Sequence, residues 1–202
     1  MVDAAQRGGI VIGEAAVSPD PFAHITVERC LSPSLESDLI AWLESDAPWR
    51  LVETDFYEQY EFSLFDAELP ASCAWLVDRH SLAKLRESMA AVFGCKFADR
   101  MSLVAHKLVP GQRIAIHNDF LAGEETHRLT VQLNRGLCDG DGGFFMLFND
   151  SDPANVYQVL RPLSGSALGF AIGANSYHAV SQLHGGTRYT VVVSLYASDG
   201  QP

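Results

Sequence analysis

The chain has 202 residues, of which 48% are hydrophobic and 19% charged, and its formal net charge is −11. Length and composition predict one globular domain with a substantial core. The acidic balance argues against non-specific binding to nucleic acid or anionic membranes, and no apolar run reaches the roughly 20 residues of a membrane-spanning helix. We therefore expect neither nucleic acid nor a membrane as a partner.

The cysteines are widely spaced and form no CxxC pair. We interpret them as reduced thiols, mostly small core residues, and a disulfide or a zinc cluster is the alternative. Residues 1–13 lack the charged segment and long apolar stretch of a secretion signal. Together these features predict a cytoplasmic protein. The four cysteines are Cys30, Cys73, Cys95 and Cys138.

The first 100 residues predict a mixture of strands and helices. Residues 24–29 are typical of a strand, and Ser32-Pro33 is typical of a helix start, with an apolar face further along the segment. A second helix is expected over residues 81–93, because its apolar residues recur at helical spacing and Gly94 follows them. Between the two helices, residues 49–64 alternate like strands.

The second half predicts a β-rich core. Short segments rich in β-branched and aromatic residues are separated by Gly, Asp, Asn and Pro turn signals, which favours a sandwich or jelly roll. The fold class is thus α+β and mainly β, with the early helices packed on one sheet. We expect a single domain over residues 1–202, in which 1–100 supply helix and strand support and a lid, and 101–197 form the catalytic core. The expected strands are 102–109, 113–118, 127–134, 143–148, 156–161, 166–171, 177–183 and 187–196.

The segment RIAIHND, residues 113–119, carries two candidate metal ligands. Alternate residues of a strand share a face, so His117 and Asp119 are expected to point the same way. A second histidine, His178, follows on a different predicted strand. Two histidines and one carboxylate make a facial triad that leaves adjacent metal positions open. Iron(II) uses such positions for a 2-oxo acid and dioxygen, whereas structural zinc would take a fourth protein ligand.

A candidate co-substrate anchor follows on the last strand. 2-Oxoglutarate has a distal carboxylate that requires a cation, and Arg188 can form a bidentate pair with it. Thr190 lies two residues further on, so its hydroxyl shares that face and can donate a second hydrogen bond. The opposite face of the strand is apolar and fits a packed core.

These motifs together resemble the 2-oxoglutarate/Fe(II)-dependent dioxygenases, and more narrowly their prolyl-4-hydroxylase-like branch. The match covers roughly residues 101–196 and includes the order of the motifs as well as their spacing. Two positions depart from the branch, because Leu108 stands where a tyrosine often contacts the co-substrate, and Arg188 replaces a frequent lysine. The matching motifs are His117-Asn118-Asp119, the strand from Arg128 to Asn134, Gly142-Gly143, Pro162 to Gly165, His178 to Val180, and Arg188.

The resemblance implies a double-stranded β-helix that binds Fe(II), 2-oxoglutarate and O2 and releases succinate and CO2, with ascorbate as a supporting reductant. It implies His117, Asp119 and His178 as the catalytic iron ligands and Arg188 as the carboxylate anchor. The expected reaction is hydroxylation of an unactivated C–H bond of an amino-acid side chain. The substrate is either a small-molecule amino acid, free or carrier-bound, or a peptide or protein.

Several features have two interpretations. Arg128, Thr130, Gln132 and Asn134 form a polar stripe that either faces solvent or lines the mouth of the barrel, where Arg128 and Gln132 would contact the co-substrate. The run FYEQYEF, residues 56–62, is either a strand with packed aromatic residues or part of a lid. Residues 138–143 are read as a hairpin turn, with weak calcium binding as the alternative.

The remaining histidines are expected to have no metal role. His106 and His127 are alternative ligands without a matching partner, and His24, His80 and His184 are expected at the surface. A rival to the enzyme is a redox-silent, cupin-like metal-binding or small-molecule sensor module, which would keep the β-fold and the histidines without requiring Arg188.

Overall fold

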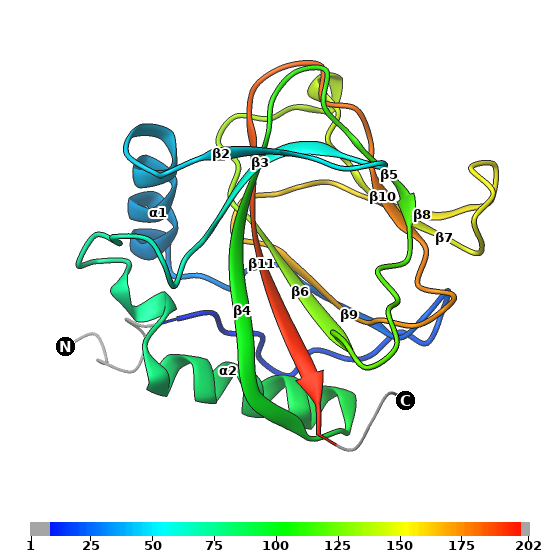
Figure 1. Ribbon diagram of the computed structural model, residues 1–202, viewed down its shortest axis with the longest axis horizontal. Coiled ribbons are helices and arrows are strands. Elements are labelled where there is room, and N and C mark those ends of the chain that lie inside the picture. Colours follow the sequence, from blue (N-terminus) through cyan, green and yellow to red (C-terminus); the bar gives the residue numbers. More distant parts are fainter. Residues whose placement is uncertain (1–8, 199–202) are drawn as a thin grey trace.

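The computed structural model describes residues 9–198, which form two antiparallel sheets facing each other and two α-helices outside the larger sheet (Figure 1). The larger sheet has seven strands in the order β1-β9-β6-β11-β4-β3-β2, and the smaller has four in the order β5-β10-β7-β8. The elements are β1 (His24–Val27), α1 (Pro33–Ser45), β2 (Arg50–Glu53), β3 (Glu58–Ser63), the 3-10 turn η2 (Ala74–Leu76), α2 (Arg79–Phe93), β4 (Phe97–Leu108), β5 (Ile114–His117), β6 (His127–Gln132), the 3-10 turn η3 (Asp139–Asp141), β7 (Phe145–Phe148), β8 (Val156–Leu160), β9 (Ala167–Ala171), β10 (His178–Val180) and β11 (Arg188–Ala197).

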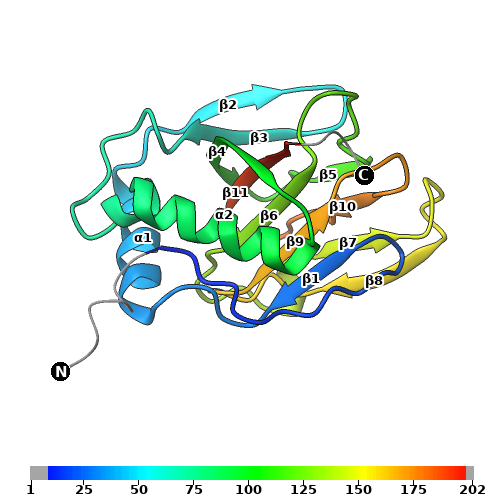
Figure 2. The same cartoon turned by 90° about the horizontal axis from the view of Figure 1, so that it is seen from below.

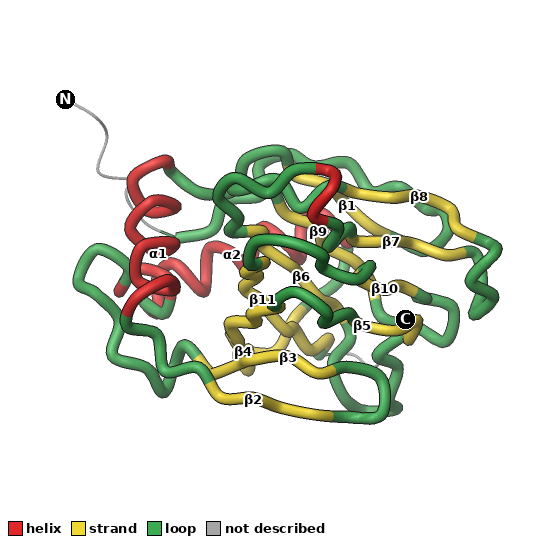
Figure 3. Tube along the Cα trace, turned by 90° about the horizontal axis from the view of Figure 1, so that it is seen from above, coloured by secondary structure: helices red, strands yellow, loops and turns green. Residues whose placement is uncertain are grey.

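The predicted fold class is confirmed. Each of the eight strands expected after residue 100 is present, from β4 to β11, with bounds shifted by a few residues. The first 100 residues supply both α-helices and also three strands of the larger sheet, β1, β2 and β3. Seen from above, the two sheets lie face to face, and the smaller one is on the side away from α1 (Figure 3).

Both helices begin and end on local signals in the sequence. The Ser32 hydroxyl accepts a hydrogen bond from the backbone N–H of Leu35 and caps α1. Helix α2 begins at Arg79, two residues before the predicted start, because the Asp78 carboxylate accepts the N–H groups of the next turn. It ends at Gly94, whose φ of 66° is the left-handed conformation of a helix terminus.

The two faces of the larger sheet differ in polarity. Its outer face packs against α1 and α2, and the alternate residues of β11 from Tyr189 to Leu195 contribute to this core, as predicted. Helix α2 crosses this face in the view from below (Figure 2). The inner face carries Arg128, His106 and Arg188 among apolar side chains and is directed at the smaller sheet. The site described below therefore lies between the sheets.

The four cysteines are free thiols, as expected, with Cys30 and Cys73 buried and Cys138 exposed. Across residues 9–198, no helix has the length and apolar character needed to cross a membrane. One surface prediction is wrong: His24 is 4% exposed, because its ring packs against Phe22 and its Nδ1 lies 2.9 Å from the Phe22 carbonyl.

Candidate functional site

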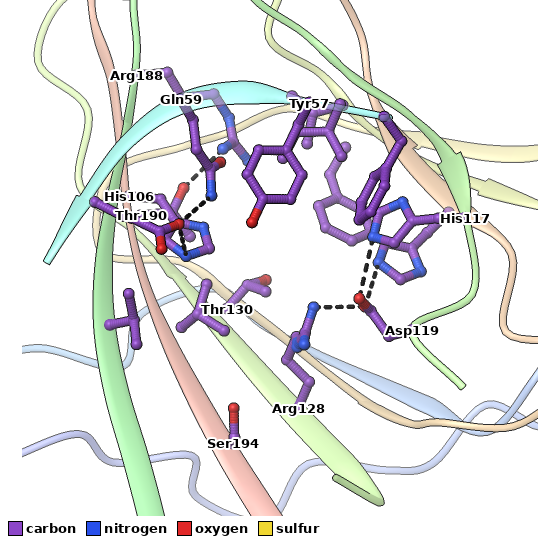
Figure 4. Close-up of a pocket in the computed structure, with 18 residues that line it drawn as sticks. Tyr57, Gln59, His106, His117, Asp119, Arg128, Thr130, Arg188, Thr190 and Ser194 are labelled. Atoms are coloured by element: carbon purple, nitrogen blue, oxygen red, sulfur yellow. Dashed lines mark hydrogen bonds and ion pairs between the residues drawn. The ribbon is translucent and has the colours of Figure 1, made fainter. Parts of the chain in front are cut away.

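The register of two neighbouring strands brings the candidate histidines together. His117 ends β5 and His178 begins β10, and the two residues are direct cross-strand partners. Their ring centroids are 4.2 Å apart. The carboxylate of Asp119 approaches both rings, so that one ligand atom from each of the three residues lies within 4.8 Å of the others (Figure 4).

The hydrogen bonds of the two histidines favour a cation between them. Nδ1 of His117 lies 2.9 Å from the Ala115 carbonyl, and Nδ1 of His178 lies 2.8 Å from the Ser176 carbonyl. A carbonyl only accepts, so each Nδ1 is the donor and each Nε2 of a neutral ring is left with a lone pair. Burial lowers the pKa of His178, which favours its neutral ring.

The lone pairs of the two Nε2 atoms face the carboxylate of Asp119, which is also an acceptor. The Nε2 atoms of His117 and His178 lie 3.3 and 3.1 Å from the two carboxylate oxygens of Asp119. Burial raises the pKa of Asp119, but the opposing effect of its neighbours, among them the Arg128 guanidinium, is larger and holds the pKa well below its ordinary value. Three acceptor atoms that converge in this way fit a divalent metal, and the donor set of two imidazoles and one carboxylate fits Fe(II).

The alternation of side chains along a strand does not explain why Asp119 points toward the two histidines. Strand β5 ends at His117, and Asp119 has a φ of 58°, the one positive value among the non-glycine residues from 9 to 198. Asn118 stabilises this turn, because its amide donates to the Ala174 carbonyl and its side-chain oxygen accepts from the Phe120 N–H. A backbone held in this sparsely populated region is typical of functional sites.

Arg128 contacts the Asp119 carboxylate. Its Nε and Nη2 donate to the two carboxylate oxygens of Glu125 at 2.9 and 2.6 Å, and its Nη1 donates to Asp119. The guanidinium is thus fixed by Glu125 and presented to the oxygen of Asp119. This places Arg128 at the metal end of the cavity, where it contacts a ligand residue.

Aromatic rings surround the two imidazoles. Phe145 stacks on His178 with ring centroids 5.3 Å apart and an interplanar angle of 7°, and Phe170 contacts the same ring at 4.9 Å. Phe56 lies 4.8 Å from the His117 ring. These apolar walls limit the access of water to the Nε2 atoms and fix the orientation of the rings.

The opposite end of the cavity holds Arg188. Its side chain is buried, its Nε donates to the Gly143 carbonyl at 2.9 Å, and its Nη1 donates to the Thr190 hydroxyl at 2.7 Å. Nη2 is buried and has no partner. Burial lowers the pKa of Arg188 to about 10. A buried guanidinium with a free donor is unfavourable alone and fits an anionic group of a ligand.

Gly143 is required for this arrangement. Its φ is 70°, and a Cβ atom at this position would lie 3.0 Å from Cδ of Arg188 and from Cδ1 of Leu183. The glycine predicted as part of a turn therefore also lets the arginine approach the backbone carbonyl that orients it.

The polar stripe that begins on β6 is buried at Thr130, Gln132 and Asn134 and partly buried at Arg128, so its solvent-facing interpretation is wrong. Arg128 and Thr130 line the cavity between the sheets. Gln132 accepts a hydrogen bond from Thr190 at 3.3 Å and lines a second cavity near β1 and β8. Asn134 has a structural role, because its amide donates to the Pro162 carbonyl and its oxygen accepts from the Tyr189 N–H.

The cavity has a volume of about 270 Å³, and the place of several lining residues in it was not predicted from the sequence. The cavity is lined by Gln59 and Glu61 of β3 and by Tyr57, which directly precedes this strand. His106 lines it from the neighbouring strand β4. The run 56–62 therefore includes most of strand β3 and lines the cavity. Alternation along this run was the available signal, but it does not reveal which face meets the cavity. Figure 4 shows Gln59, His106 and Thr190 across the cavity from His117 and Asp119.

The other histidines have positions of their own. His127 is buried against Phe93 and Phe97, and burial lowers its pKa to about 4, as for a core histidine. His80 and His184 are exposed, as expected. In the 138–143 loop, Asp141 accepts from the Cys138 N–H, so this carboxylate stabilises the turn.

No protein-family model matches the chain, and no curated protein matches it in sequence. Its structure is similar to solved structures of oxygenases. A Pseudomonas putida prolyl-4-hydroxylase superposes with a TM-score of 0.70 at 18% identity, over 86% of this chain and 91% of the other. A Trichoplax adhaerens prolyl hydroxylase, in complex with a hypoxia-inducible-factor peptide fragment, gives 0.66 at 11% identity, over 87% and 84%.

A Burkholderia pseudomallei oxidoreductase of the 2OG-Fe(II) oxygenase family gives a TM-score of 0.62 at 15% identity, over 88% of this chain and 87% of the other. At these identities the similarity establishes a shared fold. It confirms at the level of the fold the resemblance to the prolyl-4-hydroxylase-like branch.

Proposed function

We propose that this protein is a 2-oxoglutarate/Fe(II)-dependent oxygenase that hydroxylates an unactivated C–H bond. The observation that carries the proposal is the presence, in one cavity, of a three-residue metal site and a buried guanidinium with a free donor. A metal site alone would also suit a sensor module. The unpaired donor of Arg188 is what an anionic co-substrate explains and a closed metal-binding module does not.

Each part of the site has a role in this reaction. His117, Asp119 and His178 would hold Fe(II) and leave adjacent coordination positions open, and the bound iron supplies the activation of O2. Arg188 would pair with the distal carboxylate of 2-oxoglutarate through Nη2, while Thr190 holds the guanidinium in place. Arg128 would keep the Asp119 carboxylate oriented when the metal binds.

The surroundings of the triad would protect the reaction from water. Phe145 and Phe170 pack on His178, and Phe56 packs on His117 at the exposed side of the site. Phe56 is 38% exposed, so it lies at the boundary between cavity and solvent. We propose that the segment before β3 acts as a cover over the bound co-substrate and substrate.

For the substrate, we propose an amino-acid side chain, either of a free amino acid or within a peptide. The support for a peptide is that a prolyl hydroxylase of the same fold is bound to a peptide fragment. The free thiols of the chain support a reducing compartment such as the cytoplasm.

The test is to add 2-oxoglutarate to the Fe(II)-loaded protein without oxygen and record the visible spectrum. A chelated 2-oxo acid gives a weak metal-to-ligand absorption, and admission of oxygen should then yield succinate. Asp119→Ala should abolish both signals. Tight zinc binding with no absorption and no succinate would instead favour the redox-silent metal-binding module.

A further inference from the structure

A second polar group lies on the cavity wall, apart from the metal triad and Arg188. Glu61 on β3 and His106 on β4 are direct cross-strand partners, and Gln59 lies two residues before Glu61 on the same face. The Gln59 amide donates from Nε2 to the Glu61 carboxylate at 3.0 Å, and Nε2 of His106 lies 3.8 Å from the same oxygen.

Among the described residues, the carboxylate of Glu61 makes no ion pair with an arginine or a lysine, since Arg50, its cross-strand partner on β2, is exposed and does not come within 4.0 Å of it. Within the part of the chain that the structure describes, His106 is the one basic residue within 4.0 Å of it. Burial and the nearby Arg128 and Arg188 lower the pKa of His106 to about 3, so its ring is neutral at pH 7. The side chain of Glu61 is 27% exposed, so its negative charge is partly enclosed in the cavity without a direct ion-pair partner.

Gln59 adds a second acceptor at the same place. The residue is 1% exposed, and its Oε1 has no hydrogen-bond partner. Its orientation is fixed by Glu61, because exchanging the two amide atoms would place Oε1 against a carboxylate oxygen, which cannot donate. The wall thus combines a carboxylate and a buried amide oxygen, both of which require a donor.

Neither iron nor 2-oxoglutarate supplies that donor. Both ends of 2-oxoglutarate carry carboxylates at neutral pH, which accept hydrogen bonds and are repelled by Glu61. The Tyr57 ring lies between Gln59 and His117 in Figure 4, and an aromatic face favours a cation beside it. The missing ligand is therefore a donor with positive charge.

We propose that Glu61, with Gln59, binds a cationic nitrogen of the substrate, an alkylammonium or a guanidinium group, while the substrate's C–H bond is presented to the metal end of the cavity. This inference rests on the proposed function and narrows its substrate to a basic amino-acid side chain or an amine of similar length. Glu61 and Gln59 are then specificity-determining residues, and neither is a metal ligand.

The test measures binding without turnover. Zinc-loaded protein saturated with 2-oxoglutarate is titrated calorimetrically with arginine and lysine, each as the free amino acid and as the Nα-acetyl amide. Citrulline and norleucine, whose side chains are uncharged, are titrated in the same two forms as counterparts of arginine and lysine. At least one charged probe should bind about tenfold or more tightly than its uncharged counterpart, as expected for a charge-assisted hydrogen bond.

The nearly isosteric Glu61→Gln should remove this preference and leave the affinity for 2-oxoglutarate and the unfolding midpoint unchanged. Gln59→Met should weaken it in the same direction. Glu53→Gln, an exposed glutamate on the neighbouring β2, is the matched control and should behave as wild type.

The outcomes separate the two proposals. A wild-type protein that binds 2-oxoglutarate but shows no preference for any charged probe overturns the assignment of Glu61 and leaves the oxygenase intact. A preference that persists in Glu61→Gln overturns it as well. A wild-type protein that does not bind 2-oxoglutarate overturns the proposed function together with this inference.

Discussion

The two ends of the cavity differ in how completely their polar atoms are paired. At the metal end, the Nδ1 atoms of both histidines, the Arg128 guanidinium and Glu125 have hydrogen-bond partners within the protein. At the far end, the Arg188 donor and the Gln59 acceptor are buried without partners. Because unpaired buried groups are unfavourable, the first end is organised before ligands bind, and the second is completed by them.

The largest effect is expected from His178→Ala at the organised end. Loss of a ligand should abolish succinate formation and reduce Fe(II) affinity by more than the roughly 10–100-fold that outer partners of a metal site account for. Equilibrium metal binding and succinate release measure this. The exposed His184→Ala is the control, and normal turnover in His178→Ala would disprove the triad.

Arg188→Met tests the far end. Removal of the buried guanidinium should weaken 2-oxoglutarate binding by about 100-fold or more, because its carboxylate loses a desolvated ionic partner. Metal affinity should be unchanged, and Arg188→Lys should restore part of the binding. Separate calorimetric titrations with the metal ion and with 2-oxoglutarate measure the two affinities independently. An equal loss of metal binding would show that the two ends are not independent.

Arg128→Gln tests a residue of the metal end that contacts the candidate ligand Asp119 but is not itself a candidate ligand. The Asp119 carboxylate would lose the donor that orients it, so metal affinity should fall about 10–100-fold. Fe(II) or Co(II) titration measures the change. Arg135→Gln, at an exposed arginine, serves as the comparison. If metal affinity is unaffected but 2-oxoglutarate binding is lost, Arg128 contacts the co-substrate.

The smallest effect is expected from Gly143→Ala. Strain at a φ of 70° and the close contact with Arg188 should destabilise the fold by about 1 kcal/mol and weaken 2-oxoglutarate binding by up to about tenfold. Gly111→Ala isolates the second cause, since its φ is 97° but no atom lies within 4 Å of the added Cβ. Identical behaviour of the two variants would remove Gly143 from the site.

The sequence predicted the strands and the metal triad because both depend on short-range patterns. HxD, HAV and the arginine ten residues later are each local, and turn residues separate the strands. The conformation of Asp119 was not predictable in this way, because its positive φ depends on a turn held from the distant Ala174.

The contacts that could not be predicted from the sequence join residues far apart in the chain, or involve side chains for which the pattern allows more than one partner. Glu61 and His106 meet through the register of β3 and β4, which pattern alone does not define. The expected contact of Arg128 with the co-substrate stays a prediction, and the polar stripe alone did not reveal that Glu125 directs this guanidinium to Asp119.

The two sheets already contact each other at the site, where Arg128 donates to Asp119 and Arg188 donates to the Gly143 carbonyl, and a bound ligand would add a further contact between them. Both histidines stand on the smaller sheet, whereas Arg188 stands on the larger. A single molecule that chelated a metal at the histidines and paired with Arg188 would therefore act as an additional, removable cross-link between the layers of the sandwich. If the proposed function is correct, occupancy would be linked to thermal stability, and consumption of the co-substrate would remove the contact that its binding had added.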